Sequence, residues 1–248
     1  MTSKLAIYVG TPLVVFLAWF AMSAAEVVDP FLLPSPIDVG VDLSAVLADE
    51  STYPHLLTTV SQIFTAFLIA AVAGIVIGLP VGWYRMAQRA YEPVLANIYA
   101  VPLVILYPVI ALIFGIGSTS KVVFGALYAF FPVVLATVSA VALVDQDLVS
   151  AGRSMGARGL DLFRVVVVPA ARPRIVAGLR LGLILATLAV VGGQFIAGTE
   201  GLGYLLATAG QSFQTVEMFA YILLTLALAA ALNGLMAALD HHTNRSFR

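Results

Sequence analysis

The stretch SAGRSMGARGLDLFRVVVVPAARPRI, Ser150 to Ile175, places one basic, glycine-containing segment in an otherwise apolar chain. It holds five of the twelve Lys and Arg residues of the sequence, namely Arg153, Arg158, Arg164, Arg172 and Arg174. The surrounding sequence reads like the interior of a membrane. The question is therefore what role this charged segment has in the second half of the chain.

The composition excludes several classes of protein. Of 248 residues, 61% are hydrophobic and only 10% are charged, whereas a soluble domain has roughly 25% charged residues. A net charge of −1 argues against nucleic-acid binding, which needs a basic surface. The chain has no cysteine, so disulfides, thiolate zinc sites and cysteine nucleophiles are excluded. A multi-pass protein of the cell (inner) membrane is predicted.

Six apolar segments are long enough to cross a bilayer, which takes about 20 helical residues. We predict an all-α membrane protein with six transmembrane helices, at residues 5–25, 56–81, 94–114, 122–144, 175–197 and 219–239. The first segment has an alternative interpretation as a signal peptide, because Lys4 precedes it and AMSAAE resembles a cleavage site. Its length, and the position of Trp19 and Phe20 in an interfacial belt, favour a retained helix.

The distribution of charge predicts the orientation. With the N-terminus inside, all cations but Lys121 lie in cytoplasmic segments or near the inner face, as the positive-inside rule requires. The predicted outer segments instead carry acids: Glu26, Asp29, Asp38, Asp42, Asp49, Glu50, Glu200 and Glu217. Both termini are therefore predicted to be cytoplasmic.

The predicted outer segment 26–54 begins with DPFLLPSP, whose prolines prevent a helix. After it, Val39, Leu43, Val46 and Leu47 recur at helical spacing. This pattern indicates a short amphipathic helix on the outer surface. A loop with accidental periodicity is the alternative.

Glycines repeat at four-residue spacing in two of the predicted spans, at Gly74, Gly78 and Gly82 and at Gly178 and Gly182. Small residues on one stripe allow helices to approach closely in lipid. The stripes therefore predict static packing, or alternatively an interface that moves. Four prolines in or near the spans predict kinks: Pro80, Pro102, Pro108 and Pro132.

Catalytic chemistry is not indicated. The histidines have no acidic partners at metal-ligand spacing, and no serine, histidine and acid can be assembled at one depth. GIGSTSK, Gly115–Lys121, lacks the spacing of a phosphate loop. No cofactor, metal or catalytic residue is predicted. The polar candidates for a solute pathway are Arg180, which lies roughly 9 Å along the helix from Arg174, and Gln194 and Asn233.

The opening stretch is predicted to form a helix–turn–helix within a loop at 145–174. Leu148, Ala151, Gly152 and Met155 share one helical face, Gly156 provides a left-handed turn, and a second helix runs until Pro169 ends it. One interpretation is a basic segment held on anionic lipid. We favour a docking element for a cytoplasmic partner.

The loop resembles the EAA loop of type I ABC importer permeases, the inner-membrane components of binding-protein-dependent transport systems. Their pattern is E-A-A-x3-G-x9-I-x-L-P. The matching positions here are Ser150, Ala151, Gly152, Gly156, Val166, Val168 and Pro169. Serine replaces the glutamate of the pattern, and glycine replaces its second alanine.

Further motifs resemble the nitrate/sulfonate/taurine/bicarbonate branch of these permeases: LLPSP at 32–36, FGIGSTSK at 114–121 and GTEGLGYLL at 198–206. That branch often has a glutamate where this chain has Gln194. The glycine-rich segment 198–218 is predicted to be a flexible outer gate or scoop, whose apolar YLLATA face dips among the helices. Its candidate residues, together with Arg180 and Gln194, are Gly201, Gly203, Tyr204 and Leu205.

The resemblance implies a single permease domain over residues 1–248 that imports a small polar or anionic solute. Two copies, expected to be a homodimer, would line the pathway. An extracytoplasmic binding protein would deliver the solute, and two cytoplasmic ATPase subunits would bind ATP and Mg. The docking residues would be those of the loop: Ser150, Ala151, Gly152, Arg153, Met155, Gly156, Arg158, Leu160 and Pro169. The chain itself has no Walker loop and is not expected to be an enzyme. A secondary carrier, a channel and a membrane-embedded enzyme are the alternatives.

Overall fold

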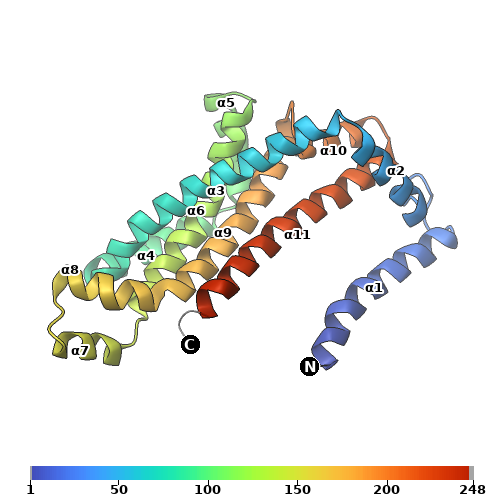
Figure 1. The fold of residues 1–248 in the computed structure, drawn as a ribbon. Coiled ribbons are helices and arrows are strands. Elements are labelled where there is room, and N and C mark those ends of the chain that lie inside the picture. The colour runs from blue at the N-terminus through green and yellow to red at the C-terminus, as the bar shows by residue number, and fades with distance from the viewer. Residues whose placement is uncertain (1, 246–248) are drawn as a thin grey trace.

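The computed structural model describes the backbone of residues 2–245 and the side chains of residues 10–238. The described chain is helical and contains no strand (Figure 1). Its elements, in order, are α1 (Thr2–Ala24), α2 (Pro36–Ala48), α3 (Thr52–Trp83), α4 (Arg85–Ala100), η1 (Leu103–Leu106), α5 (Tyr107–Phe114), α6 (Ser118–Ala142), α7 (Gln146–Ser154), α8 (Gly159–Leu162), η2 (Phe163–Val167), α9 (Val168–Ala197), α10 (Leu202–Gln211) and α11 (Thr215–Arg245).

The core of the bundle is α6, which packs between α3 and α9. The predicted glycine stripes form both interfaces. A Cβ at Gly78 would lie 2.6 Å from Thr137 Cβ, and one at Gly182 would lie 2.6 Å from Val133 Cγ2. The backbones of α3 and α9 therefore approach α6 more closely than any larger residue would allow, which is how helices gain packing energy in lipid.

Four helical segments of the described chain are long and apolar enough to cross a membrane: Thr52–Trp83, Ser118–Ala142, Gly159–Ala197 and Thr215–Ala238. A fifth candidate is the pair Arg85–Ala100 and Leu103–Phe114, which is bent by 75°. The first predicted span coincides with α1, of which Gly10–Ala24 forms a shorter apolar helix among the described side chains.

The segment predicted as a span at 94–114 is kinked at Pro102, as the sequence indicated, but it begins before residue 94 and is divided into two helices. The helix begins earlier, at Arg85, and breaks at Val101 and Pro102. The residue before a proline is pushed out of the α region, and Val101 is extended, with φ −70° and ψ 135°. The chain therefore turns before α5, which projects at the top of Figure 1. Because α4 begins at Arg85, this segment also carries Arg85 and Glu92.

Pro169 does not end the second helix of the loop, as the sequence predicted. Helical structure runs without a gap from Gly159 to Ala197, so the helix of the fifth span starts well before Ile175. Just before the proline, Val168 N–H bonds to Phe163 O, five residues back. This wide turn accommodates a residue that has no N–H and whose ring clashes with a regular helix.

The short helix predicted within 26–54 from the spacing of Val39, Leu43, Val46 and Leu47 is present as α2. Ser35 caps it by accepting a hydrogen bond from Asp38 N–H at 3.1 Å. Val46 packs against Ala220 and Tyr221 of α11, so α2 is anchored to the bundle. After α2, the Ser51 N–H and hydroxyl donate to Asp49 at 2.9 and 2.7 Å, which lowers the pKa of that carboxyl.

Helix α1 diverges from the rest of the bundle (Figure 1). Trp19 of this helix donates its indole N–H to Pro34 O at 3.0 Å. The same ring lies 5.9 Å from the ring of Phe219. Trp19 thus joins α1 to α11 and to the segment before α2.

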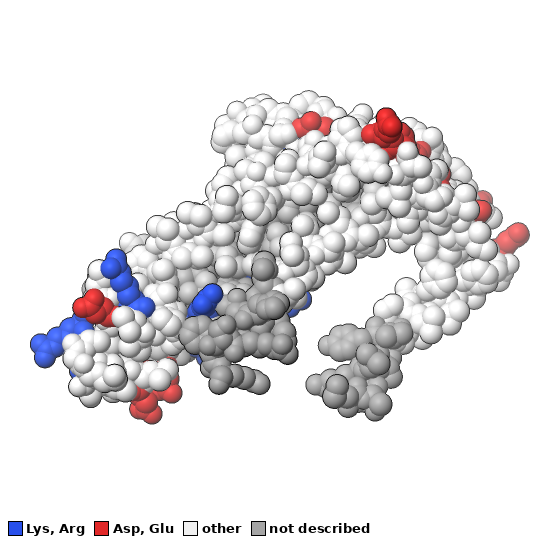
Figure 2. Space-filling view, viewed as in Figure 1, with Lys and Arg blue, Asp and Glu red and all other residues white. Residues whose placement is uncertain are grey.

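Charge separates along the molecule. On the face seen in Figure 2, the Lys and Arg side chains gather towards α7 and α8, together with several acids, whereas the opposite end near α2 and α10 shows acids and no cation. The first turn of α1 and the last turns of α11 lie on the lower side of Figure 1, as α7 does. Lys4, Arg245 and Arg248, which also supported the predicted orientation, lie outside the described side chains.

Candidate functional site

Helix α7 forms the free end of the helix–turn–helix at the basic end of the bundle. Asp145 caps its start by accepting a hydrogen bond from Asp147 N–H at 2.9 Å. At its end Gly156 has φ +93°. Gly156 N–H bonds to Arg153 O and Ala157 N–H bonds to Gly152 O, both at 3.0 Å. These two bonds form a Schellman motif, so Gly156 adopts the left-handed turn expected from the sequence.

The inner face of α7 is packed into the bundle. Val149 belongs to a buried cluster with Val141 of α6, Leu162 of α8 and Ile175 of α9. A Cβ at Gly152 would lie 2.8 Å from Val166 Cγ2, so glycine at this position permits close contact between α7 and η2. The inner face of α7 therefore lies against α8 and η2, in a cluster shared with the ends of α6 and α9.

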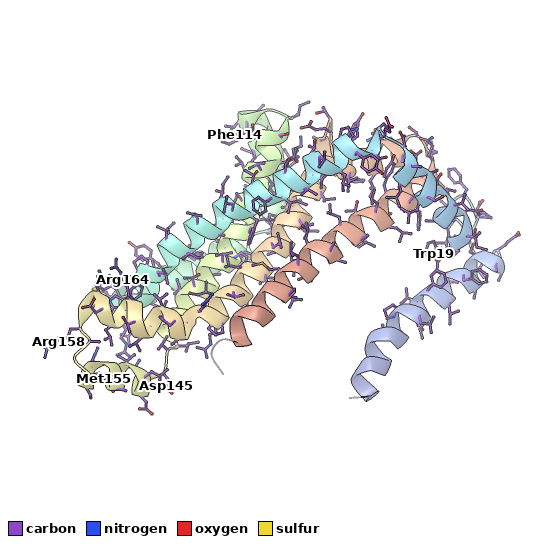
Figure 3. The ribbon with its side chains drawn as sticks, viewed as in Figure 1. Trp19, Phe114, Asp145, Met155, Arg158 and Arg164 are labelled. Atoms are coloured by element: carbon purple, nitrogen blue, oxygen red, sulfur yellow. The ribbon has the colours of Figure 1, made fainter. Side chains whose placement is uncertain are left out.

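The outer face of α7 and the turn after it expose apolar side chains. Met155 is 88% exposed, Leu160 is 58% exposed and Leu148 is 51% exposed. The predicted stripe is thus divided: Gly152 is buried, whereas Leu148, Ala151 and Met155 face outward with Ser150. Figure 3 shows Met155 and Arg158 at the turn between α7 and α8, on the periphery of the molecule. Arg153 is also exposed, and Pro169 is half-buried.

At the opposite end, Gln194 is at the centre of a buried hydrogen-bond network. Gln194 has no exposed surface. Its Oε1 accepts from Thr59 Oγ1 and from Gly203 N–H, both at 3.1 Å, and its Nε2 donates to Gln62 Oε1 at 2.9 Å. Gln62 Nε2 donates in turn to Ser118 Oγ at 2.8 Å. The network joins α3, α6, α9 and α10.

The same side chains cap α10. The first amide groups of a helix have no partner within it. Here Gly201 N–H donates to His55 Nδ1 at 2.9 Å, and Leu202 N–H donates to Thr59 Oγ1 at 2.8 Å, while Gly203 N–H uses Gln194. Ser118 Oγ also donates to Glu200 of the preceding turn. The start of α10 is therefore fixed to α3 and α9.

Two of the glycines expected to supply flexibility in 198–218 lie in tightly packed surroundings. A Cβ at Gly201 would lie 2.3 Å from Gln194 Cδ, and one at Gly203 would lie 2.3 Å from Val191 O. These glycines allow close packing around Gln194. Tyr204 stacks on His55 with ring centroids 5.8 Å apart, and Leu205 packs beside Val46 and Tyr221.

Sequence reasoning missed the position of Lys121, which it placed in an outer turn. The side chain is 1% exposed. Its Nζ donates to Ala197 O at 2.8 Å and also to Ile116 O. Lys121 thus connects the turn before α6 to the end of α9. The sequence GIGSTSK gave no sign of this role, because both acceptors are backbone carbonyls.

A groove of about 630 Å³ lies between α9, α10 and α11. Its walls are mainly aliphatic, and its polar lining residues are Thr187, Thr225 and Asn233. Asn233 Oδ1 accepts from Arg180 Nε at 2.7 Å, so Arg180 bonds to α11 rather than to the loop. Among the described residues, no group of three or more His, Cys, Asp or Glu side chains is arranged to hold a metal.

Comparison with known proteins identifies the family. The profile described as "Binding-protein-dependent transport system inner membrane component" matches residues 70–245. The chain belongs to this family. It is therefore a multi-pass membrane permease of the ABC importer type, as the resemblance in its sequence indicated, and the family implies an ATPase and a substrate-binding protein as partners.

Individual relatives agree with this assignment. The taurine transport system permease protein TauC of Escherichia coli is 28% identical over 227 residues, covering 90% of this permease and 82% of the relative. The riboflavin transport system permease protein RibX of Chloroflexus aurantiacus is 36% identical over 198 residues, covering 80% and 74%. An inward-facing structure of the MetNI methionine ABC transporter has a TM-score of 0.63 at 23% identity, covering 79% of this permease and 99% of that chain. That likeness concerns the fold.

Proposed function

We propose that two copies of this permease line the solute pathway of an ATP-driven importer, and that residues 145–174 dock on a separate cytoplasmic ATPase. The geometry of α7 is the observation that carries this proposal. Its inner face is buried against α8 and η2, in a cluster that includes residues of α6 and α9, while Met155 at its end and Leu160 of α8 are exposed. An ATPase that binds the outer face would move the spans through the inner one.

The proposed orientation places α7 in the cytoplasm and α2 and α10 outside. The separation of charge in Figure 2 supports it, because cations are retained on the cytoplasmic side. In this orientation the segment 198–218 and α2 form the surface that receives solute from a binding protein. Gln194, Gly201 and Gly203 then act as the framework of the outer gate, and Tyr204 and Leu205 as its half-buried face.

The proposed solute is small and polar or anionic. TauC, named for taurine, and RibX, named for riboflavin, show that relatives of this chain carry different solutes. Support for an anion comes from Arg180, whose bond to Asn233 places a cation beside the groove between α9 and α11. ATP hydrolysis is assigned to the partner subunit.

The turn at Gly156 tests the docking role. An added Cβ would meet no atom within 4 Å, so a substitution there strains the backbone without disturbing the packing. We expect Gly156→Val to cost about 1 kcal/mol or more locally, whereas Gly156→Asn should be tolerated because asparagine adopts the left-handed region more readily. Pull-down of the ATPase and ATP-dependent uptake in proteoliposomes are the measurements.

The two variants should reach the membrane in equal amounts, because the spans bury their own surface. Gly156→Val should lose ATPase association and uptake, and Gly156→Asn should keep both. Full association and uptake by Gly156→Val would show that this loop does not couple ATP hydrolysis to transport.

A further inference from the structure

A second cavity of about 630 Å³ lies between α7 and the ends of the spans. We call it the α7 pocket. Its polar lining comes from two segments: Arg85 and Gln88 of α4, and Gln146 and Arg153 of α7. Trp83, the last residue of α3, forms another wall, and aliphatic side chains complete it. The pocket thus lies between the docking helix and the connection from α3 to α4.

The lining of the α7 pocket is suited to an anion. It contains two guanidinium groups and two amides but no carboxylate. Among the described residues, the Arg85 and Arg153 side chains have no ion-pair or hydrogen-bond partner, so both groups are available to a ligand. Guanidinium groups keep their charge and bind phosphate oxygens through paired N–H donors. Phosphate therefore fits this lining.

The pocket lies at the end of a candidate membrane-spanning helix, where lipid headgroups are expected. The membrane-spanning helix α3 ends at Trp83, and α4 starts at Arg85. The Trp83 ring packs edge-on against Phe163 at 5.1 Å, and tryptophan is enriched where a span leaves the bilayer. Basic pockets between helices on the cytoplasmic side hold anionic headgroups.

We propose that the α7 pocket binds a phosphate group between Arg85 and Arg153, supplied by an anionic lipid headgroup or by free phosphate. The bound phosphate bridges α4 and α7. It therefore holds the docking helix in a fixed position against the bundle. This binding depends only on the pocket, so it stands whether or not residues 145–174 dock on an ATPase.

The test uses the full chain purified in neutral detergent and stripped of lipid. Native mass spectrometry compares how much phosphatidylglycerol and how much phosphatidylcholine the protein retains.

A second experiment uses a Trp19→Phe background, in which Trp83 is the remaining tryptophan. Its fluorescence is followed during titration with inorganic phosphate, and titration with chloride at equal ionic strength is the comparison. Preferential retention of phosphatidylglycerol with no response to phosphate identifies a lipid site. A specific response to phosphate, with the two lipids retained equally, identifies a site for the free anion.

Arg85→Gln and Arg153→Gln should each weaken the preferred ligand by about tenfold, the loss typical of one charge-assisted hydrogen bond. Arg158→Gln is the matched control, because Arg158 is exposed on the same loop but does not line the pocket. The proposal would be overturned if the protein with an intact pocket retained both lipids equally and showed no specific response to phosphate. Unchanged binding in both pocket variants would also overturn it.

Discussion

The side-chain oxygen of Gln194, a residue with no exposed surface, accepts a hydrogen bond from Gly203 N–H at 3.1 Å. A side chain of α9 thus satisfies an amide at the start of α10. Because Gln194 also bonds to Thr59 and Gln62, one residue fixes α10 against α3 as well. The proposed outer gate is therefore attached to the bundle at its first turn.

Replacing Gln194 with leucine should destabilise the protein. Gly203 N–H and Gln62 Oε1 would lose their partner while remaining buried, and each unsatisfied group costs about 1–3 kcal/mol. We expect a lower midpoint of thermal unfolding in detergent. Thr187→Val is the control, because Thr187 is also buried on α9 but donates only to Leu183 O of its own helix. If Gln194→Leu unfolded no earlier than Thr187→Val, the network would contribute little to stability.

Local sequence signals predicted the loop at the basic end well. Gly156 ends α7 in the left-handed conformation because the determinants of that turn lie within a few residues. The glycine stripe from Gly74 to Gly82 correctly indicated a packed face, because helical periodicity places those residues on one side. Where periodicity and turn chemistry are sufficient, the sequence predicted the structure.

Long-range contacts were not predictable in this way. Gln194 bonds to Thr59 across 135 positions, and no periodic pattern relates them. Pro102 was recognised as a source of a kink, but the size of the bend depends on how α5 packs against Phe124 of α6. Pro169 was read as the end of a helix because a wide turn, which accommodates the ring, leaves no signal in composition.

Lys121 should be protected from acylation in the folded protein. Lysine occurs only at positions 4 and 121, and the Lys121 amine is buried and bonded to Ala197 O. We expect sulfo-NHS-acetate to modify Lys121 slowly in the native protein and fully after unfolding in SDS, as measured by peptide mass. The unfolded sample is the control. Equally rapid modification in both states would contradict the buried position.

Cysteine labelling should establish the orientation of the bundle. The chain has no cysteine, so single substitutions need no other change. Ser44, Ser154 and Ser212 are all exposed and lie on α2, on α7 and after α10. In sealed cells, a membrane-impermeant maleimide should label Ser44→Cys and Ser212→Cys but not Ser154→Cys. Permeabilised cells provide the control. Labelling of Ser154→Cys in sealed cells would reverse the proposed topology.

Two equally exposed methionines allow the docking surface to be tested with the same substitution at both positions. Met155 is 88% exposed and Met86 is 87% exposed. Met155 lies at the end of α7, and Met86 lies near the start of α4, outside the proposed docking loop. Neither side chain contributes much to the core, so Met155→Ser and Met86→Ser should unfold at the same temperature as the unaltered permease.

Only Met155→Ser should weaken retention of the ATPase. Full burial of a methionine at an interface stabilises it by about 1.5–3 kcal/mol, which corresponds to at least about a tenfold change in affinity. The measurement is the dissociation constant of the detergent-solubilised permease for its ATPase at fixed salt. If the contact is mainly apolar, the difference in affinity between the two variants should stay the same when salt is raised. Salt screens charges but does not weaken apolar burial in this way. Equal affinity of the two variants would place the ATPase contact away from the end of α7.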